Sequence, residues 1–323
     1  MPQVTIATTA REMAGLRPLW ESLCAHRRFT IFQDFHWNLL AFTMFDAREK
    51  PWVVCARASY GTAIVPTVVR HSDFSLRLLG EELFDYRTFL WDGETSVLAC
   101  ALAALAGLER RLEVVAVREP DRVGICDGLQ LLSFSAAPVV RCADGPAEEF
   151  AATHGRLARN LRLLARLGFD VKTYRGNNAP LLRTIYERKA AQDPNSLFHD
   201  SLRVKFLVNA GLFNPGAFEI FTLECGSRMA AALVTLRDRD VRRLYTAWFD
   251  PELKKFSPGL TLIYEVTRRS LAAGLDCDYM TGEQPYKLRL STASVPLYRL
   301  RATSQQLAAL DDLRQHSSEL ISS

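Results

Sequence analysis

The chain has 323 residues, about twice the usual length of one compact domain, so we expect two domains or one large one. Apolar residues make up 48% and charged residues 24%, which excludes a disordered or fibrous protein. With 40 Lys and Arg against 36 Asp and Glu, the net charge of +4 excludes a strongly basic nucleic-acid scaffold.

In chain order, the apolar periodicity and the turn residues predict alternating helices and strands. In the first half, helices are expected within 11–45, a hairpin at 51–58 and 61–69, strands at 76–79, 88–91 and 112–117, and helices at 96–111 and 147–167. In the second half, a hairpin is expected at 218–224 and 229–236, strands at 242–248 and 277–281, and a helix at 259–273.

The two halves repeat one order of elements at an offset of 165 residues, which places Gly61 on Gly226, Leu79 on Leu244 and Ser96 on Thr261. We therefore expect an α/β protein of two related halves, 1–147 and 148–323.

The cysteine pattern indicates the redox environment in which the protein works. Seven of them are scattered in mostly apolar surroundings, without a C-x-x-C pair or a metal-ligand spacing. This pattern favours reduced thiols in a cytoplasmic protein without a metal site. No secretory signal is visible in 1–11, and the longest apolar run, 97–108, is too short to span a bilayer. Peripheral contact with the inner membrane surface stays open.

Three short motifs of the second half carry a family resemblance. They are YTAWFDP at 245–251, FSPGL at 256–260 and GEQPYK at 282–287. In this order and spacing they resemble the cellulose-biosynthesis (CelD-like) acetyltransferases, a tandem-GNAT group akin to the Fem peptidyltransferases. The resemblance implies a tandem GNAT-like fold, two mixed sheets flanked by helices, in which the first half is degenerate and the second binds acyl-CoA.

The segment that leads into the helix at 259–273 is the candidate coenzyme site. Ser257 is positioned to cap this helix, Pro258 suits its first turn, and Gly259 permits close approach of a ligand to the free amides beyond it. An ordinary capped helix has the same pattern. The resemblance implies that the coenzyme A pyrophosphate binds here, although Ser257 replaces the first glycine of the family's motif. The coenzyme-binding residues implied are Trp248, Phe249, Lys254, Ser257, Gly259, Leu260 and Thr261.

Trp248 and Phe249 end the strand that, by the resemblance, splays from its neighbour beside the thioester carbonyl; they are equally well explained as core aromatics. In the first half, Asp92-Gly93-Glu94 stands at the matching place and would repel a pyrophosphate.

An amine that attacks a thioester has to lose a proton, so the enzyme needs a base. The candidate catalytic residues are Asp250, Glu283, Tyr286 and Lys287. Asp250 or Glu283 would be the base, Tyr286 the acid for the departing thiolate, and Lys287 a ligand of a phosphate or carboxylate. A structural i,i+4 ion pair between Glu283 and Lys287 is the alternative.

Three functions follow from these observations. The first is an N-acyltransferase that moves an acyl group from acyl-CoA directly to an amine, either an amino sugar of an envelope polysaccharide precursor or a long-chain amine such as a sphingoid base. The second is a Fem-like transferase that uses aminoacyl-tRNA, and the third is a non-catalytic partner in polysaccharide biosynthesis. The arginines of 156–166 form either a solvated helix face or a contact with an anionic acceptor or membrane. No other nucleic-acid partner is expected.

Overall fold

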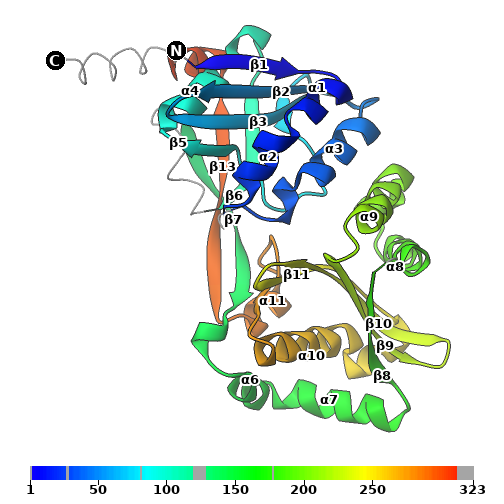
Figure 1. Ribbon diagram of the computed structural model, residues 1–323. Helices are drawn as coiled ribbons and strands as arrows, with labels where there is room; N and C mark the ends of the chain where they lie inside the picture. Colours follow the sequence, from blue (N-terminus) through cyan, green and yellow to red (C-terminus); the bar gives the residue numbers. More distant parts are fainter. Residues whose placement is uncertain (1, 27–28, 81, 119–128, 177, 311–323) are drawn as a thin grey trace. The chain divides into compact units, whose positions relative to one another are not determined.

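The computed structural model describes residues 2–26, 29–80, 82–118, 129–176 and 178–310. These residues separate into two compact units, drawn as ribbons in Figure 1. Unit 1 comprises the described residues of Met1–Ser135 and Pro296–Ser323, and unit 2 is Ala136–Val295.

The strands of unit 1 follow the order β1-β2-β3-β4-β6-β13, and β5 also pairs with β3. They are β1 (Gln3–Ala7), β2 (Glu49–Ala58), β3 (Gly61–Arg70), β4 (Leu76–Leu78), β5 (Leu90–Gly93), β6 (Leu112–Arg118) and β13 (Ala293–Ala302). The β-branched runs of β2 and β3 form the expected antiparallel hairpin, and side chains such as Val53, Val54, Ile64 and Val65 are buried in it.

The helices of unit 1 are α1 (Ala10–Gly15), α2 (Arg17–Cys24), α3 (Phe35–Met44) and α4 (Thr95–Ala103). The side chains of Val97 to Leu102 in α4 are all buried, and the helix packs on β2 and β3. The expected helix 96–111 is therefore shorter than predicted. Its continuation is a 3₁₀ turn at Ala106–Leu108, after which Glu109 takes a left-handed conformation that ends the helical geometry.

The strands of unit 2 follow the order β7-β12-β11-β10-β9-β8. They are β7 (Gln130–Val140), β8 (Asp170–Arg175), β9 (Phe218–Cys225), β10 (Arg228–Asp238), β11 (Val241–Phe249) and β12 (Asp276–Asp278). Its helices are α6 (Ala147–Thr153), α7 (Gly155–Arg166), α8 (Ala179–Gln192), α9 (Ser201–Phe213), α10 (Pro258–Ala272) and α11 (Pro285–Leu290).

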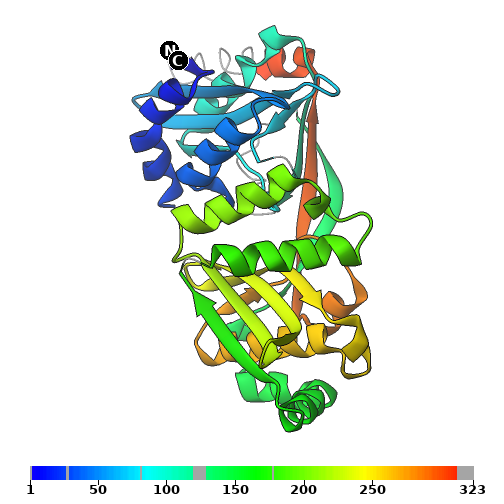
Figure 2. The ribbon, with the colours of Figure 1, turned by 90° about the vertical axis from the view of Figure 1, so that its right-hand side faces the viewer.

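The helices of unit 2 cover both faces of its sheet. Helix α10 packs on β9, β10 and β11, and α6 and α7 pack in turn on α10. Helices α8 and α9 lie against each other on the opposite face, as Figure 2 shows. The core between α10 and the sheet contains buried side chains such as Leu233, Leu262 and Val266.

The two units repeat one strand pattern, as the sequence offset predicted. In each, a hairpin is followed by a pair of parallel neighbours, β4 with β6 in unit 1 and β11 with β12 in unit 2. An antiparallel strand then follows: β13 pairs with β6, and β7 pairs with β12. The α/β class and the mixed pairing are confirmed, although the strands of the described residues belong to one 13-stranded sheet where two sheets were expected.

The division of the chain also differs from the expected 1–147 and 148–323. Strand β7 extends into unit 2, where Val139 and Val140 pair with β12, and β13 returns to unit 1, where Leu297 to Ala302 pair with β6. The last strand of each half therefore completes the sheet of the other half, and contiguous halves do not describe the packing.

The long helix expected at 147–167 is two helices, α6 and α7, which meet at His154. The backbone of His154 leaves the helical region, with φ −109° and ψ 36°. Its ring nitrogens lie 2.8 Å from the Phe150 carbonyl oxygen and 3.2 Å from that of Arg289, which fixes the bend against the last turn of α11.

Candidate functional site

Strand β12 runs beside β11 only along the beginning of β11. Their parallel pairing covers Val241 to Arg243 on β11 and Asp276 to Asp278 on β12, whereas β11 continues along β10 to Phe249. After β12 the chain follows β7 instead, because Tyr279 donates to the Pro138 carbonyl and Gly282 to that of Ala136. The later part of β11 thus diverges from its parallel neighbour, as the resemblance implied.

A cluster of buried ion pairs lies where the pairing of β11 with β12 ends. Arg243, which is 5% exposed, bonds to the carboxylates of Asp278 and Asp238. The other oxygen of Asp278 accepts from the Met280 amide at 2.8 Å, and Met280 takes a left-handed conformation with φ 65°. Sequence reasoning missed Arg243 and Asp278. The signal that would have found them is opposite charge in two neighbouring strands, a pair of arginines at the start of β11 and two aspartates in β12.

The N-terminus of α10 lies beside the end of β11. A Cβ added to Gly259 would lie 3.3 Å from Phe249, so the glycine permits a close approach of helix and strand. Within the part of the chain that the structure describes, the amides of Gly259 and Leu260 have no acceptor. Together with the helix dipole, two free amides favour an anion at this position.

Ser257 does not cap α10 with its side chain, contrary to expectation. It occupies the N-cap position in a left-handed conformation, with φ 47° and ψ 54°, and its hydroxyl makes no capping bond. This conformation favours glycine, the residue expected there from the family's motif. Ser257 therefore preserves the backbone turn that the replaced glycine would make.

Thr261 supports the same turn from inside the fold. Its side chain is fully buried and donates to the Phe256 carbonyl at 3.1 Å, and Asn160 of α7 donates to the same oxygen at 3.0 Å. The hydroxyl of Thr261 is thus committed to the turn, which leaves only the backbone near this position for a ligand.

The remaining predicted coenzyme residues differ in exposure. Lys254 is exposed on the 3₁₀ helix η5 (Pro251–Phe256), which leads into α10. Trp248 is buried beneath Arg188, whose guanidinium carbon lies 4.9 Å from the ring centroid, whereas Phe249 is 38% exposed. The packing of Trp248 makes it a core aromatic residue. Of the two side chains, only that of Phe249 is exposed enough to contact a ligand bound along β11.

Lys287 is buried, and its ammonium points to backbone. The residue is 8% exposed, and Nζ donates to the carbonyls of Thr281 at 2.8 Å and Met280 at 3.3 Å. It holds the loop that carries the chain away from β11. This placement indicates a positioning role rather than contact with a phosphate.

Glu283 and Tyr286 precede Lys287 in the chain, and Glu283 does not form the helical pair suggested for it. Helix α11 begins at Pro285, so Glu283 precedes it on the loop, with an exposed side chain. The i,i+4 geometry expected for Glu283 and Lys287 on one helix therefore does not form. Burial raises the pKa of the Tyr286 phenol, which keeps it protonated and able to donate.

Asp250 has a structural role at the start of η5. Its carboxylate accepts from the Glu252 amide at 2.9 Å, which caps η5, and it pairs with Arg228 of the β9–β10 hairpin at 3.0 Å. Because the Asp250 carboxylate is committed to these two partners, the exposed Glu283 is the better placed of the two candidate bases.

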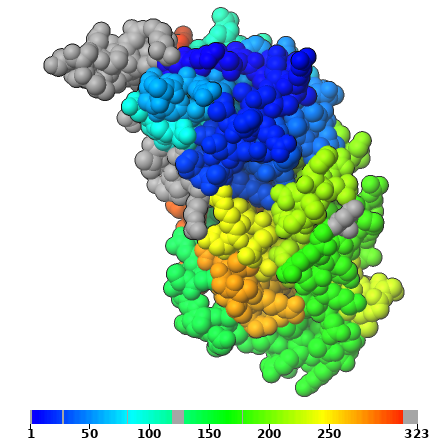
Figure 3. Space-filling model, in the orientation of Figure 1, coloured from blue at the N-terminus to red at the C-terminus, as the bar shows by residue number. Residues whose placement is uncertain are grey.

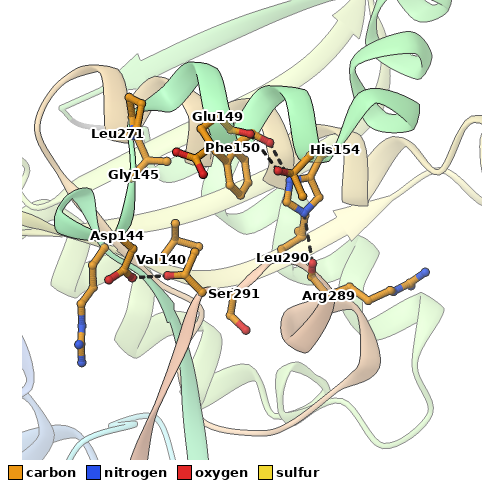
Figure 4. Close-up of a pocket in the computed structure, with 14 residues that line it drawn as sticks. Val140, Asp144, Gly145, Glu149, Phe150, His154, Leu271, Arg289, Leu290 and Ser291 are labelled. Atoms are coloured by element: carbon orange, nitrogen blue, oxygen red, sulfur yellow. Dashed lines mark hydrogen bonds between the residues drawn. The ribbon is translucent and has the colours of Figure 1, made fainter.

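A separate cavity of about 170 Å³ opens at the other end of α10 (Figure 4). The buried side chains of Phe150, Leu271 and Leu290 contribute to its lining, and the carboxylate of Glu149 lies beside Gly145. None of the described residues that line it is a predicted site residue. This cavity is therefore distinct from the candidate acyl-donor site.

Neither a metal-binding cluster nor a membrane-spanning helix occurs among the described residues. No group of three or more His, Cys, Asp or Glu side chains there could hold a metal ion. No helix among them has the length and apolarity needed to cross a bilayer.

Family comparison defines the class of unit 2. Residues 151–288 match the family model of the acetyltransferase (GNAT) domain. The matched range contains β11, the start of α10 and the loop to Lys287, so unit 2 contains a GNAT-type acyltransferase domain. No curated protein matches the chain significantly.

Solved structures extend the likeness to both units. The C-terminal domain of an Agrobacterium fabrum protein described as a lysylphosphatidylglycerol synthetase has a TM-score of 0.62 at 10% identity, over 94% of this chain and 96% of that one. FemX gives 0.55 at 9% identity, over 95% and 99%. A tandem GNAT protein from the clavulanic acid biosynthesis pathway gives 0.50 at 9% identity, over 94% and 99%. At these identities the likeness shows the fold alone, and the expected tandem GNAT-like fold is confirmed.

Proposed function

We propose that unit 2 transfers an acyl group from acyl-CoA directly to an amine. The observation that carries this proposal is the pair of free amides, Gly259 and Leu260, at the start of α10 beside a strand that diverges from its neighbour. The amides and the exposed Lys254 suit a pyrophosphate, and the open edge of β11 suits an extended pantetheine arm.

The proposed reaction assigns one task to each group of residues. Backbone amides of β11 polarise the thioester carbonyl while the amine nitrogen attacks its carbon. Glu283, directly or through a water, accepts the proton that the amine loses. Tyr286 donates a proton to the sulfur as the carbon–sulfur bond breaks, so the products are an amide and free coenzyme A. Lys287 acts indirectly, by holding the loop at Met280 and Thr281.

The first acceptor class follows from the CelD-like resemblance and the second from the 18 phenylalanines and the arginine-rich helix of 156–166; both expose a primary amine. One is an amino sugar of an envelope polysaccharide precursor, and the other is a long-chain amine such as a sphingoid base. The placement in the cytoplasm is part of the same proposal.

The strongest alternative is a Fem-like transferase that takes an aminoacyl group from tRNA. It is favoured by the fold shared with FemX over 95% of this chain. A non-catalytic partner is less well supported, because Ser257 keeps the left-handed turn that the glycine of the motif would make.

Calorimetric titration of the full chain separates these functions. We expect saturable binding of acetyl-, octanoyl- or palmitoyl-CoA, and the preferred chain length would indicate a sugar or a lipid acceptor. Binding of aminoacyl-tRNA without binding of any acyl-CoA would replace the proposal by the alternative. Binding of neither donor would contradict both enzymatic functions.

Two variants test the catalytic roles in turnover assays. Glu283→Gln should lower kcat by about 100-fold, because an amide cannot accept the proton that the amine loses. Tyr286→Phe should lower kcat with little change in KM. An unchanged rate would remove the residue from the mechanism.

A further inference from the structure

Helix α7 contains an unusual concentration of positive charge. Its sequence, GRLARNLRLLAR, has four arginines and no acidic residue. Four charges equal the formal net charge of the whole chain, +4. Arg156, Arg159, Arg162 and Arg166 are all exposed.

These four arginines are not used to hold the fold together. Several other arginines of unit 2, by contrast, are paired with carboxylates: Arg175 and Arg242 with Glu219, Arg228 with Asp250, Arg243 with Asp278, and Arg268 and Arg269 with Glu265. Within the residues that the structure describes, no carboxylate pairs with an arginine of α7. Their charge is therefore available to a partner.

The fold fixes which way this charge faces. Leu157, Asn160 and Leu164 are the buried residues of α7, and the helix packs on α10 and η5. Arg159, Arg162 and Arg166 are spaced three and four residues apart, which places them on one side of the helix, opposite the buried face. Figure 3 shows α7, in green at the lower edge of unit 2, on the molecular surface. The three side chains form a stripe of about 10 Å.

Apolar residues accompany the stripe along one edge. Leu163 is half-buried, and Leu167, directly after the helix, is 54% exposed. Arginines beside an exposed leucine suit the interface of a lipid bilayer, where the charges meet phosphate groups and the leucine meets the acyl boundary. A single-stranded nucleic acid would favour aromatic side chains for base stacking, and α7 has none.

We propose that α7 docks unit 2 on an anionic lipid surface through Arg159, Arg162, Arg166 and Leu167. The contact is electrostatic and reversible, and it weakens as salt rises. This inference goes beyond the acyl transfer and stands independently of it. A docked enzyme would meet acceptors that carry a lipid tail at the membrane surface.

Vesicle sedimentation with the full chain tests the proposal. We expect low-salt binding to phosphatidylcholine vesicles that contain phosphatidylglycerol, and none to phosphatidylcholine alone. The triple variant Arg159→Gln, Arg162→Gln, Arg166→Gln should bind about 100-fold more weakly, since each arginine near such a surface contributes roughly fivefold. The matched control, Arg11→Gln, Arg57→Gln, Arg111→Gln, removes the same charge from exposed positions of unit 1 and should bind nearly as the parent does.

Four results would overturn the proposal. They are no binding of the parent to the anionic vesicles, an equal loss in the control variant, displacement of the vesicles by tRNA through the same arginines, and an equal loss of acyl-CoA affinity in the α7 variant. The last result would assign the stripe to the donor site. Circular dichroism of both triple variants establishes that they are folded.

Discussion

The starts of α4 and α10 are matching places in the two units, but only one of them is open. In unit 1 a single residue, Glu94, separates β5 from α4, and its amide donates to the Tyr60 carbonyl at 3.2 Å. A Cβ on Gly93 would lie 2.0 Å from the same oxygen. The hairpin turn thus covers the start of α4, and the acidic Glu94 stands where an anion would have to bind.

In unit 2 the same hairpin is held away from the helix. Residues 250–257 separate β11 from α10, and Arg228 of the hairpin pairs with Asp250 and Glu252 within that segment. The amides of Gly259 and Leu260 consequently stay open. The same order of strands and helix therefore leaves the helix N-terminus open in unit 2 and closed in unit 1. The difference lies in the length of the segment between the strand and the helix.

The segments beside the parallel strands also leave space for a ligand in unit 2 but not in unit 1. In unit 1, buried aromatic residues follow β4, and Arg87 donates its amide to Ala116 of β6 at 3.4 Å. Phe84 and Tyr86 belong to this segment, and both are buried. In unit 2, β11 runs on to Phe249 and β12 turns away. In unit 1 the chain itself therefore fills the space that follows β4, whereas in unit 2 the corresponding edge of β11 has no such cover among the described residues.

Making the start of α10 resemble that of α4 should have the largest effect. Gly259→Glu places a carboxylate at the open amides, against Phe249, and should weaken acyl-CoA binding about 1000-fold, or ~4 kcal/mol. Isothermal titration calorimetry measures the loss. Glu94→Gln, at the closed helix of unit 1, is the control and should leave the affinity unchanged. Retained affinity in Gly259→Glu would place the donor elsewhere.

A buried glutamate clamped by arginines occurs in each unit and makes stability depend on pH. Glu219 of unit 2 bonds to Arg242 at 2.8 Å and to Arg175 at 2.9 Å. Although burial opposes it, these guanidiniums lower the pKa of Glu219 below its usual 4.5. The stabilisation is therefore present above the unfolded value and is lost as pH falls through the folded one.

Glu219→Gln should lower the free energy of unfolding by about 3 kcal/mol at neutral pH, because Arg242 is left without its charged partner. The difference from the parent should shrink as pH falls below 4.5, the ordinary value of the carboxyl. Denaturant titrations at several pH values measure it. Glu113→Gln is the counterpart in unit 1, where Arg77 and Arg301 lower the pKa of Glu113 despite burial. A pH-independent difference in either variant would contradict this account.

The divergence of β11 and β12 should depend on Lys287. Lys287→Met keeps the length of the side chain but removes the donor to the carbonyls of Met280 and Thr281, and should cost about 2 kcal/mol of stability. Chemical denaturation measures the change. Lys205→Met, an exposed lysine of α9, is the control, with an expected change within about 0.5 kcal/mol. Full stability with lost donor binding would return Lys287 to direct contact with the ligand.

Periodicity and turn residues were sufficient to predict the hairpins and the repeated order of strands and helices, because each depends on local pattern. They could not predict that β7 and β13 pair in the sheet of the other half, since strand partners are chosen by long-range packing. They also placed Gly259 at the start of a helix, but the side-chain cap expected of Ser257 and the helical pair suggested for Glu283 and Lys287 do not form. A backbone angle and the partner of a buried ammonium are set by tertiary contacts that no spacing shows.

The N-cap residues provide the smallest and most specific test of the comparison. Ser257 is left-handed at φ 47°, whereas Glu94 is extended at φ −77° and ψ 143°. Ser257→Gly relieves a left-handed conformation that costs a non-glycine residue roughly 1 kcal/mol in the folded state. This gain equals or exceeds the loss of stability that glycine causes by adding conformational entropy to the unfolded chain. Glu94→Gly adds that freedom without relieving strain.

We therefore expect a gain of up to ~1 kcal/mol for Ser257→Gly and a loss of similar size for Glu94→Gly in denaturant titrations. Acyl-CoA affinity should be retained in both. Equal losses would show that the left-handed Ser257 stores no strain. In that case the serine would have to be explained by its hydroxyl, which is available to a phosphate because it makes no capping bond to α10.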